Sequence, residues 1–418
     1  MKLFLINIMY WIYLYSDSFI WQNNKEFLIY NTSSHNSIQG KCIGNLKTII
    51  LGLHNTINLY CIEVEERVCR EDKCVRTFLT DLRKSLCGNF KIKTSNVLER
   101  PISLPPIPNV QSEISRRKDK MNFDYLSYIN HIEINYGKKT NVHLLANSLN
   151  DFLRTKPSIN ITLLSEEAFE TKGALGGLLK RLSLRGFHIS LTLPYNYYIK
   201  NSYFIDSISS LIQSLCITTN CQTNKLIQIP TTSPFKEKFT IQYNISDIKE
   251  YTLIARFLHE KKLSFPVRFC FEFANKDSAL AFISFTKTDV LNRRLSKTDI
   301  YRHMLINSNF FGRLKVKEDG SITSPCSERI LSNIRIKNSW NTASKYECER
   351  PNSEWFLTRS SIGTICKNCL LNHLCPSPSE IEIKNGICCP CWRKRSIPTH
   401  SEWLYPLTFD AGKGLKEA

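Results

Sequence analysis

Cysteine is the residue whose number and spacing point most directly to chemistry in this chain. The 418-residue sequence contains 16 cysteines, half of them between Cys326 and Cys391. Two residues separate Cys366 from Cys369, and Cys375 follows after five more. Thiolates at such spacing reach one metal centre, and four thiolates suit tetrahedral zinc or an iron–sulfur cluster. The predicted metal ligands are Cys366, Cys369, Cys375 and Cys388, with Cys389, Cys391 or Cys326 as alternative ligands.

Spacing alone leaves the kind of metal open. Zinc commonly takes two matched Cys-x2-Cys pairs, whereas three clustered cysteines with a more distant fourth are typical of an iron–sulfur cluster. Thiols that bind nothing are the third alternative. In a reducing compartment clustered cysteines indicate metal more often than disulfides, and we predict a cytoplasmic protein.

Two apolar runs occupy the beginning of the chain. Met1–Trp21 is rich in aromatic residues, Gln22–Lys25 is turn-like, and Phe27–Tyr30 is apolar again. Two β-prone runs around a polar turn predict a β-hairpin. A targeting segment headed by Lys2 is an alternative, although no small-residue cleavage site follows, and a true start at Met9 is another. We predict no membrane partner.

Strand-like and helix-like runs alternate between residues 125 and 308. The strand-like runs are Ile129–Tyr136, Ile159–Leu164, His188–Leu193, Ser214–Thr218, Phe239–Ile245 and Val267–Phe273. The helix-like runs between them include Leu144–Leu153, Gly177–Leu184 and Ile248–Glu260. This alternation predicts an α/β fold with a parallel sheet. Six units favour a partial (β/α)6 barrel over the eightfold barrel, and an open, doubly wound sheet is the alternative.

Composition divides the chain into five parts. Residues 1–100 hold the hairpin, a strand at Leu59–Val64 and a helix at Val75–Leu86, and residues 101–124 form a proline-rich linker that ends in a basic helix at Gln111–Lys120. The barrel region follows at 125–308, the cysteine-rich module at 309–395 and a tail at 396–418. The module begins with a strand–turn–strand unit around Asp319-Gly320. Metal ligation would replace a large apolar core there.

The formal net charge of +19 indicates a surface that attracts anions. The basic residues are scattered, however, and only the Arg116–Lys120 segment is a tight run. Scattered Lys and Arg usually form a solvated surface. Because no recognition helix, zinc-finger spacing or aromatic RNA-binding signature accompanies the charge, we predict no nucleic-acid partner.

The Cys-x2-Cys-x5-Cys run after a glycine-containing hairpin resembles the SPASM module of radical-SAM enzymes that modify peptides. The cysteines of that module bind two auxiliary [4Fe–4S] clusters. Cys366, Cys369 and Cys375 match the run that serves the second cluster, and one of the cysteines after residue 387 matches its last ligand. The resemblance therefore implies one [4Fe–4S] cluster, and zinc is the alternative metal.

The ligands of the first SPASM cluster have no full counterpart. No cysteine precedes Gly320 at the expected distance, Cys326 lies one residue from the matching position, and Ser379 stands where another cysteine would be. All three departures affect the same cluster. The resemblance therefore implies that this cluster is absent.

A closer resemblance is to the pseudo-radical-SAM proteins of Bacteroidales peptide gene clusters. It covers most of the chain and depends on the order of several segments. These are Tyr10–Leu14, Leu28–Thr32, Arg100–Ile107, Asn309–Leu314 and Cys366–Ser379. The resemblance implies a radical-SAM-like partial barrel followed by a SPASM-like module.

The motifs of catalysis are missing. Radical-SAM enzymes carry Cys-x3-Cys-x2-Cys just after the first barrel strand, whereas Gly137–His143 contains no cysteine. No glycine-glycine-acid motif follows Ile159–Leu164, and the chain has no HExxH, GxSxG or Walker motif. We interpret Cys216 and Cys270, within predicted strands, as small buried residues, and His131 as a loop or core residue. The resemblance implies no cleavage of S-adenosylmethionine and no catalytic residues.

The function implied by this resemblance is that of a non-catalytic accessory protein in peptide maturation. Its expected partners are a ribosomally made precursor peptide and a catalytic radical-SAM maturase. One alternative is an iron–sulfur electron-transfer or peptide-modifying enzyme that uses the retained cluster. The other is a binding protein with a structural zinc knot.

Overall fold

The computed structural model describes residues 8–93, 100–105, 124–165, 172–220, 238–261, 266–272, 279, 286–327, 329–350 and 352–387. The chain divides into two compact units, each made of separate stretches of sequence. The first unit comprises Met1–Met121, Phe285–Ile306 and Thr358–Pro378. The second comprises Asn122–Ser284, Asn307–Leu357 and Ser379–Ala418. The segment predicted as the cysteine-rich module contributes to both units.

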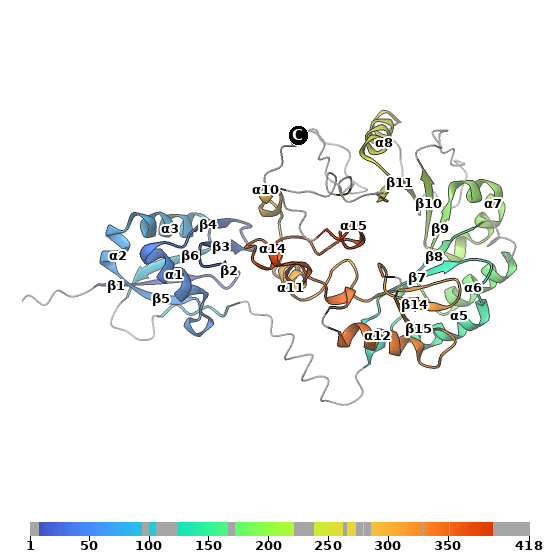
Figure 1. Ribbon diagram of the computed structural model, residues 1–418, viewed down its shortest axis with the longest axis horizontal. Helices are drawn as coiled ribbons and strands as arrows, with labels where there is room; N and C mark the ends of the chain where they lie inside the picture. Colours follow the sequence, from blue (N-terminus) through green and yellow to red (C-terminus); the bar gives the residue numbers. More distant parts are fainter. Residues whose placement is uncertain are drawn as a thin grey trace, which may run out of the picture. The chain divides into compact units, whose positions relative to one another are not determined.

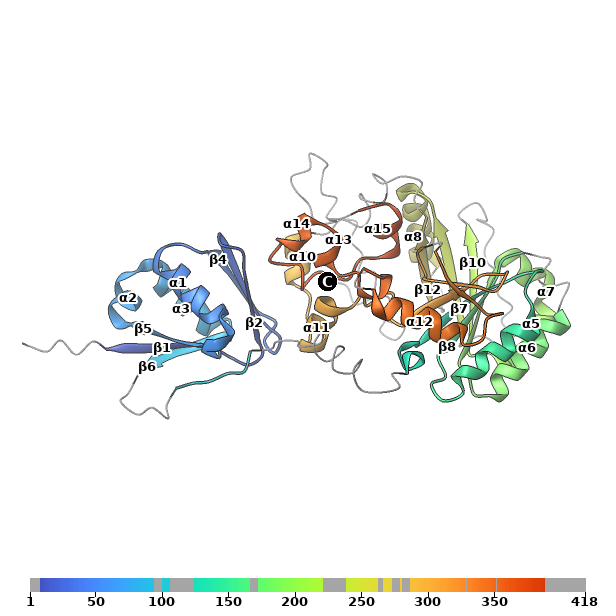
Figure 2. The same ribbon diagram turned by 60° about the horizontal axis from the view of Figure 1, so that its bottom comes forward.

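Two three-stranded antiparallel sheets form the frame of the first unit. One has the order β5-β1-β6 and the other β2-β3-β4. Their strands are β1 (Met9–Leu14), β2 (Ser18–Gln22), β3 (Glu26–Asn31), β4 (Ser37–Lys41), β5 (Cys61–Glu65) and β6 (Gly88–Ile92). Figure 2 shows helices α1 and α3 lying between strands of the two sheets.

The predicted N-terminal hairpin is confirmed, but the first apolar run is not a single strand. β2 pairs antiparallel with β3, with Trp21 opposite Leu28. β1 belongs to the other sheet, because the chain turns between the strands where Ser18 N–H donates to the Tyr15 carbonyl at 3.0 Å. Asp17 within this turn is a residue type that favours turns over continued strands.

Helices α1 (Gly44–His54) and α3 (Lys73–Lys84) pack their apolar faces into the core of the two sheets. The other helices of the unit are α2 (Glu66–Glu71), α10 (Lys287–Leu291), α11 (Lys297–Leu305), α13 (Arg359–Ile362), α14 (Thr364–Lys367) and the 3-10 turn η1 (Thr56–Asn58). The Asp72 side chain caps α3 by accepting from Cys74 and Val75 N–H. The predicted strand near Leu59–Val64 and helix near Val75–Leu86 are both present, each with shifted ends. In the part of the chain that the structure describes, no helix has the length and apolar character of a membrane span.

The start of the proline-rich segment is fixed to the first unit by Arg100. Its guanidinium donates to the carbonyls of Asn58 (3.0 Å) and Cys61 (3.1 Å) and lies 5.6 Å from the centre of the Trp11 ring. Arg100–Pro105 has no regular secondary structure, as the prolines require. The basic helix predicted at Gln111–Lys120 lies outside the described residues.

A nine-stranded, mostly parallel sheet forms the second unit. Its order is β12-β11-β10-β9-β8-β7-β13-β14-β15. The strands are β7 (His131–Tyr136), β8 (Ser158–Leu163), β9 (Ile189–Pro194), β10 (Ser214–Asn220), β11 (Phe239–Ile245), β12 (Val267–Phe271), β13 (Arg313–Val316), β14 (Ser321–Thr323) and β15 (Ile330–Asn333). All six predicted parallel strands are confirmed, with ends that differ by a few residues.

The strand order changes direction at β7. β7 to β12 follow one another across the sheet, and β13, the next strand along the chain, pairs parallel with β7 on its other side. Right-handed crossovers in a single direction place all connecting helices on one face. Figure 1 shows α5, α6 and α7 on the outer side of the arc that β7 to β11 form. No closed barrel is present among the described residues, since β12 pairs there with β11 alone.

The core of the second unit lies between the sheet and these helices. Alternate strand residues such as Ile134, Ile161 and Leu191 are fully buried against Leu145 and Leu178 of the helices. The helices are α5 (Val142–Ser148), α6 (Lys172–Leu184), α7 (Tyr195–Ser207) and α8 (Ile248–Lys261), with 3-10 turns η3 (Tyr125–Tyr128), η4 (Leu149–Phe152) and η6 (Ser209–Leu211). The three predicted helices correspond to α5 with η4, α6 and α8.

The predicted strand–turn–strand unit joins the parallel sheet directly. β13 pairs parallel with β7 and antiparallel with β14, and the turn uses Gly320 at φ +87°. Helix α12 (Ser339–Glu349) and the turn η7 (Glu354–Phe356) cover this extension with Trp340 and Trp355, both fully buried. The remaining short helix of the unit is α15 (Glu380–Lys384).

Gly312 holds the junction between β13 and β7. Its φ is +76°, and its carbonyl accepts from Asn130 N–H (2.9 Å) and His131 N–H (3.2 Å). A Cβ atom there would lie 2.3 Å from the Tyr128 carbonyl oxygen. The junction therefore requires glycine for both backbone conformation and space.

We expect Gly312→Ala to destabilise the protein by more than the roughly 1–2 kcal/mol that the left-handed conformation costs an L-residue. Gly177→Ala is the matched control, because Gly177 lies within α6 with no atom within 4 Å of an added Cβ. That control should gain up to about 1 kcal/mol from helix propensity. Urea unfolding of both variants checks the pair, and equal midpoints for Gly312→Ala and wild type would refute the role of Gly312.

Candidate binding site on the polar face of the sheet

The face of the parallel sheet opposite the helices is polar. In each of β7 to β11, buried apolar residues alternate with half-buried polar ones. The polar set comprises His131, Glu133, Asn135, Ser158, Asn160, Thr162, Ser190, Thr192, Ser214, Cys216, Thr218, Thr240, Gln242 and Asn244. The helices pack on the apolar face, so these side chains lie on the inner side of the arc.

Strand register arranges these side chains in rows across the sheet. One row runs Glu133, Asn160, Ser190, Ser214, and the next runs Asn135, Thr162, Thr192, Cys216, Thr240. Bonds form both within and between the rows: Ser214 Oγ donates to Ser190 Oγ at 2.7 Å within the first row, and Thr192 Oγ1 of the second row donates to Asn160 Oδ1 of the first at 3.0 Å. Each amide or hydroxyl has more donor and acceptor positions than these bonds use. The rows therefore retain hydrogen-bonding capacity for a ligand.

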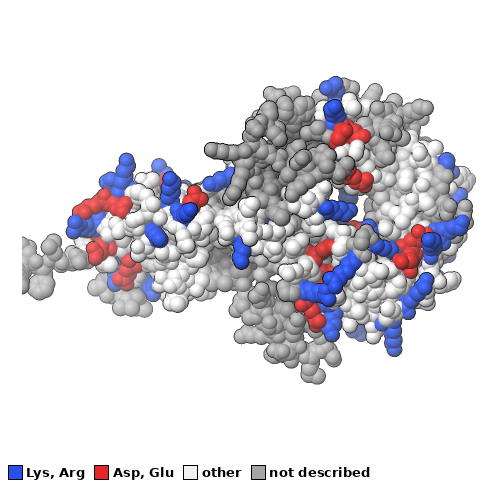
Figure 3. Space-filling model, in the orientation of Figure 1, with Lys and Arg blue, Asp and Glu red and all other residues white. Residues whose placement is uncertain are grey.

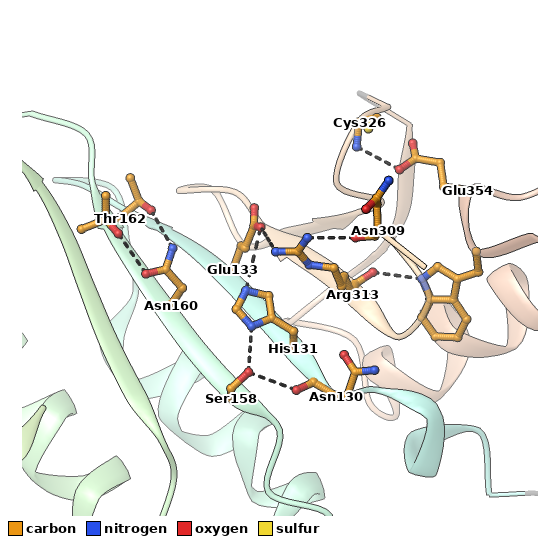
Figure 4. Close-up of polar contacts among 12 residues, drawn as sticks. Asn130, His131, Glu133, Ser158, Asn160, Thr162, Asn309, Arg313, Cys326 and Glu354 are labelled. Carbon is orange, nitrogen blue, oxygen red and sulfur yellow. Dashed lines mark hydrogen bonds and ion pairs between the residues drawn. The ribbon is translucent and has the colours of Figure 1, made fainter. Parts of the chain in front are cut away.

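A charged cluster lies at the amino ends of β7 and β13 (Figure 4). His131 Nδ1 is 2.7 Å from Ser158 Oγ, and His131 Nε2 is 3.9 Å from Glu133 Oε1. Arg313 reaches the same Glu133 oxygen at 3.4 Å and donates to the Asn309 carbonyl at 2.8 Å. Trp355 Nε1 in turn donates to the Arg313 carbonyl at 3.0 Å. The cluster links the amino end of the β7–β13 pairing to the buried tryptophan.

Burial keeps His131 and Cys216 on this face uncharged. Desolvation, followed by repulsion from Arg313, lowers the pKa of His131 to about 4. Desolvation raises the pKa of Cys216 to about 11. At neutral pH the imidazole is therefore neutral and the thiol is protonated. Both act as hydrogen-bonding groups there, and neither is prepared as a proton donor or nucleophile.

Helix α15 lies near both margins of the polar face. Burial first, and then Glu272 and Glu380, raises the pKa of Cys270 on β12. The pKa of Cys326, beyond β14, is raised by burial first and then by Glu354 and Glu380. Because Glu380 on α15 acts on both thiols, the helix lies close to both strand regions. Glu354 also fixes the Cys326 loop by accepting from the backbone N–H groups of Cys326 and Ser327.

The loop after β7 is closed by a carboxylate. Glu318 Oε1 accepts from Lys139 N–H at 2.6 Å, and a Cβ on Gly137 would lie 2.6 Å from the same carboxyl group. Thr140 Oγ1 accepts from Gly137 N–H at 3.0 Å, and α5 begins soon afterwards at Val142. Glu318 therefore occupies the space against this short turn.

The predicted metal ligands are only partly described. Cys366 and Cys375 are buried. Cys369 N–H donates to the Cys366 carbonyl at 3.1 Å, so Cys366 and Cys369 lie on one turn. Among the described residues, no three His, Cys, Asp or Glu side chains are placed to hold a metal ion. Cys388, Cys389 and Cys391 lie outside those residues, and Cys326 belongs to the other compact unit. The described thiols by themselves do not fit a metal centre, and the predicted centre stays a prediction.

A contact between two histidines joins the cysteine run, which contains His373, to His303 of α11. His303 Nδ1 is 3.0 Å from the His373 carbonyl, and the Trp21 ring lies 5.8 Å from the His373 ring. Burial first, and then repulsion from His303, lowers the pKa of His373 to about 4. His373 Nδ1 is buried and has no hydrogen-bond partner among the described residues. The run is thus packed around a neutral imidazole.

The polar face is the feature that the sequence interpretation missed. Cys216 and Cys270, expected as small buried residues, and His131, expected as a loop or core residue, are half-buried on this face. The signal was the strict alternation in runs such as Ser158–Leu163 and Phe239–Ile245. Strands buried on both faces of a parallel sheet instead read as nearly continuous apolar runs. Alternation within a parallel sheet therefore marks one uncovered face.

No protein-family model matches this chain, and no curated protein matches its sequence. The function must therefore be argued from the geometry and from the resemblance of individual segments.

We expect the stability of the second unit to depend on the protonation of His131. Its pKa is about 4 in the folded state, against about 6.5 in an unfolded chain. Between these values the unfolded state binds more protons, so the free energy of unfolding rises with pH and is lost as pH falls toward 4. Across this pH range the contribution of His131 to the free energy of unfolding changes by roughly 3 kcal/mol.

Urea unfolding of wild type and His131→Gln at a series of pH values checks this dependence. The difference between the two proteins isolates His131 from His373, whose pKa is also lowered. An NMR titration in which the His131 imidazole protonates near its ordinary pKa would contradict the expectation.

Proposed function

We propose that this chain is a non-catalytic accessory protein in the maturation of a ribosomally synthesised peptide. It binds the precursor peptide on the polar face of the sheet, alone or together with a catalytic radical-SAM maturase. The observation that carries the proposal is the set of polar rows on the inner side of the arc. The resemblance of several segments to pseudo-radical-SAM proteins is the reason for assigning the protein to peptide maturation.

A half-buried polar face suits a peptide ligand. An extended peptide presents an N–H and a carbonyl at every residue, and these groups need partners when they leave water. The Asn, Gln, Ser and Thr side chains of the rows offer both donors and acceptors. Each bond adds about 0.5–1.5 kcal/mol net, so several are needed for useful affinity.

The finer fold that we propose is a partial (β/α)6 barrel. Three features support it: the sequential order of β7 to β12, the helices on the outer side, and the closeness of α15 to both margins of the polar face. A strongly curled sheet would give the polar rows concave walls, and binding sites are usually concave.

The loop after β7 supports the non-catalytic part of the proposal. Radical-SAM-like enzymes need a cysteine triad in this loop, and here the loop is a short turn against the Glu318 carboxylate. A carboxylate in that position adds negative charge and leaves no thiolate for iron. The chain's own residues thus bind and orient a peptide without S-adenosylmethionine cleavage.

The proposal retains one metal centre in the cysteine run, made of Cys366, Cys369, Cys375 and one of the later cysteines. An iron–sulfur cluster would supply electron transfer, and zinc would supply structural stability. No step of peptide binding depends on it.

The peptide site is tested with a fluorescent synthetic precursor peptide encoded beside the gene. Asn160→Leu combined with Thr192→Val removes two neighbouring polar groups that bond to each other. We expect about tenfold weaker binding by fluorescence anisotropy, because two hydrogen bonds are lost. Replacing both partners with apolar groups of similar shape should leave folding nearly unchanged.

Thr80→Val on α3 of the first unit is the control, because its hydroxyl is exposed and bonds only locally to the Arg76 carbonyl. It should bind as wild type does. Absence of wild-type binding, with and without a partner maturase, would refute the proposed function. Equal affinities for wild type and the double variant would refute the site.

The metal centre is tested by anaerobic reconstitution with iron and sulfide, followed by visible absorption and elemental analysis. We expect bound metal in wild type and its loss in Cys369→Ser, with Cys74→Ser, an exposed cysteine on α3, unchanged. Visible sulfide-to-iron absorption identifies a cluster, whereas zinc without absorption identifies a structural knot. Wild-type protein without metal, or with equal metal in Cys369→Ser, contradicts the proposed centre.

A further inference from the structure

Two arginines of the second unit lie over one tyrosine ring. The guanidinium carbon of Arg350 is 3.5 Å from the centre of the Tyr346 ring, and that of Arg329 is 4.8 Å from it. Arg329 comes just before β15, and Arg350 directly follows α12. α12 packs beside β15, which brings two residues far apart in sequence onto the same ring.

Neither guanidinium group has a carboxylate partner among the described residues, since no acidic oxygen there lies within the 4.0 Å of an ion pair. Of the acids close to Arg350 in sequence, Glu349 accepts from Tyr125 Oη at 3.0 Å, and Glu347 is buried and bonded to Ser324. Glu328, which precedes Arg329, lies outside the described residues.

The two charges also act on each other. Partial desolvation, followed by repulsion from Arg329, lowers the pKa of Arg350. The attraction of each cation to the ring, and that of Arg350 to the carboxyl end of α12, holds them in place. The helix end accounts for Arg350 alone, and an anion between the two guanidinium groups would relieve the repulsion.

We propose that Arg329 and Arg350 form a binding site for a carboxylate side chain of an acidic peptide partner. A planar guanidinium presents two parallel N–H donors that match the two oxygens of a carboxylate. Each of the two guanidinium groups at the Tyr346 ring offers such a pair of donors to a carboxylate. This site lies outside the polar rows and does not depend on them.

Local features favour an acidic peptide over nucleic acid. The exposed Glu349 carboxylate, next to Arg350, repels a continuous run of phosphates but tolerates one carboxylate. Base stacking needs a free aromatic face, and Tyr346 is already engaged by two cations. Ile330, 62% exposed beside Arg329 in the chain, offers contact to an apolar side chain of a peptide. Elsewhere basic and acidic residues alternate over the visible surface without a continuous basic tract (Figure 3).

The test uses the full chain and a fluorescein-labelled peptide of alternating Glu and Ala, with a Gln–Ala peptide of equal length as the neutral probe. We expect the Glu peptide to bind at low ionic strength and the Gln peptide to bind much more weakly. Arg329→Ala with Arg350→Ala should weaken binding of the Glu peptide about tenfold or more. Arg67→Ala removes an exposed arginine that already pairs with Glu71 at 3.0 Å, and it should change affinity less than about twofold.

Two outcomes would overturn the proposal. Equal losses in the double variant and in Arg67→Ala would assign the binding to general positive charge. A poly-thymidine oligonucleotide that binds more tightly than the Glu peptide, with the same dependence on Arg329 and Arg350, would assign the site to nucleic acid.

A measurement on the wild-type protein guards against a variant that fails to fold. Phenylglyoxal modifies accessible guanidinium groups, and mass spectrometry locates each modified arginine. The Glu peptide should slow modification of Arg329 and Arg350 several-fold and leave Arg67 unaffected. Unchanged modification at both arginines in the presence of saturating peptide would contradict the proposed site.

Discussion

The second unit depends on one constraint: the crossover helices α5, α6, α7 and α8 pack on one face of its parallel sheet. Each right-handed crossover returns the chain to the next strand in the same direction, so these helices fall on the same side. That side must be apolar to form a core, and the buried Ile and Leu residues of β7 to β11 meet the requirement. Among the residues that the structure describes, no crossover helix covers the opposite side. Its Ser, Thr, Asn and Gln side chains satisfy one another in part, and the remaining capacity makes the face a site for a polar ligand.

The β7–β13 pairing ties the module after residue 309 to this sheet. Gly312 makes it feasible, because a side chain there would meet the Tyr128 carbonyl, and the Arg313–Glu133 ion pair lies on the polar side of the joint. The buried Trp355 donates a hydrogen bond from Nε1 to the Arg313 carbonyl of this pairing. The segment Asn309–Leu314, one of those on which the family resemblance rests, thus has a physical task. It joins two parts of the fold and contributes the only cation of the cluster shown in Figure 4.

The number of cysteines and the net charge indicated little about where the functional sites of the fold lie. A cysteine on a strand shows only which face of the sheet its side chain occupies, and Cys216 and Cys270 lie on the polar face. Net charge does not say where on the surface the charges lie, whereas the tertiary structure brings two arginines to the ring of Tyr346. A metal centre needs several ligands within about 2–2.5 Å of one ion, and spacing along the chain sets only part of that geometry.

The sequence by itself determined the six parallel strands and three of the helices of the second unit, because hydrophobic periodicity is local and each of these elements carries its own pattern. It also determined the Asp319-Gly320 turn and the N-terminal hairpin, which depend on a few adjacent residues. Strand order, the one-sided helical cover and the pairing of β13 with β7 were decided only by tertiary structure. The β13–β7 pairing in particular joins residues more than a hundred positions apart, such as Arg313 and Glu133. The alternation of apolar and polar residues within each strand already indicated the polar side chains. Only the pairing of the strands in the sheet placed these side chains next to one another in rows.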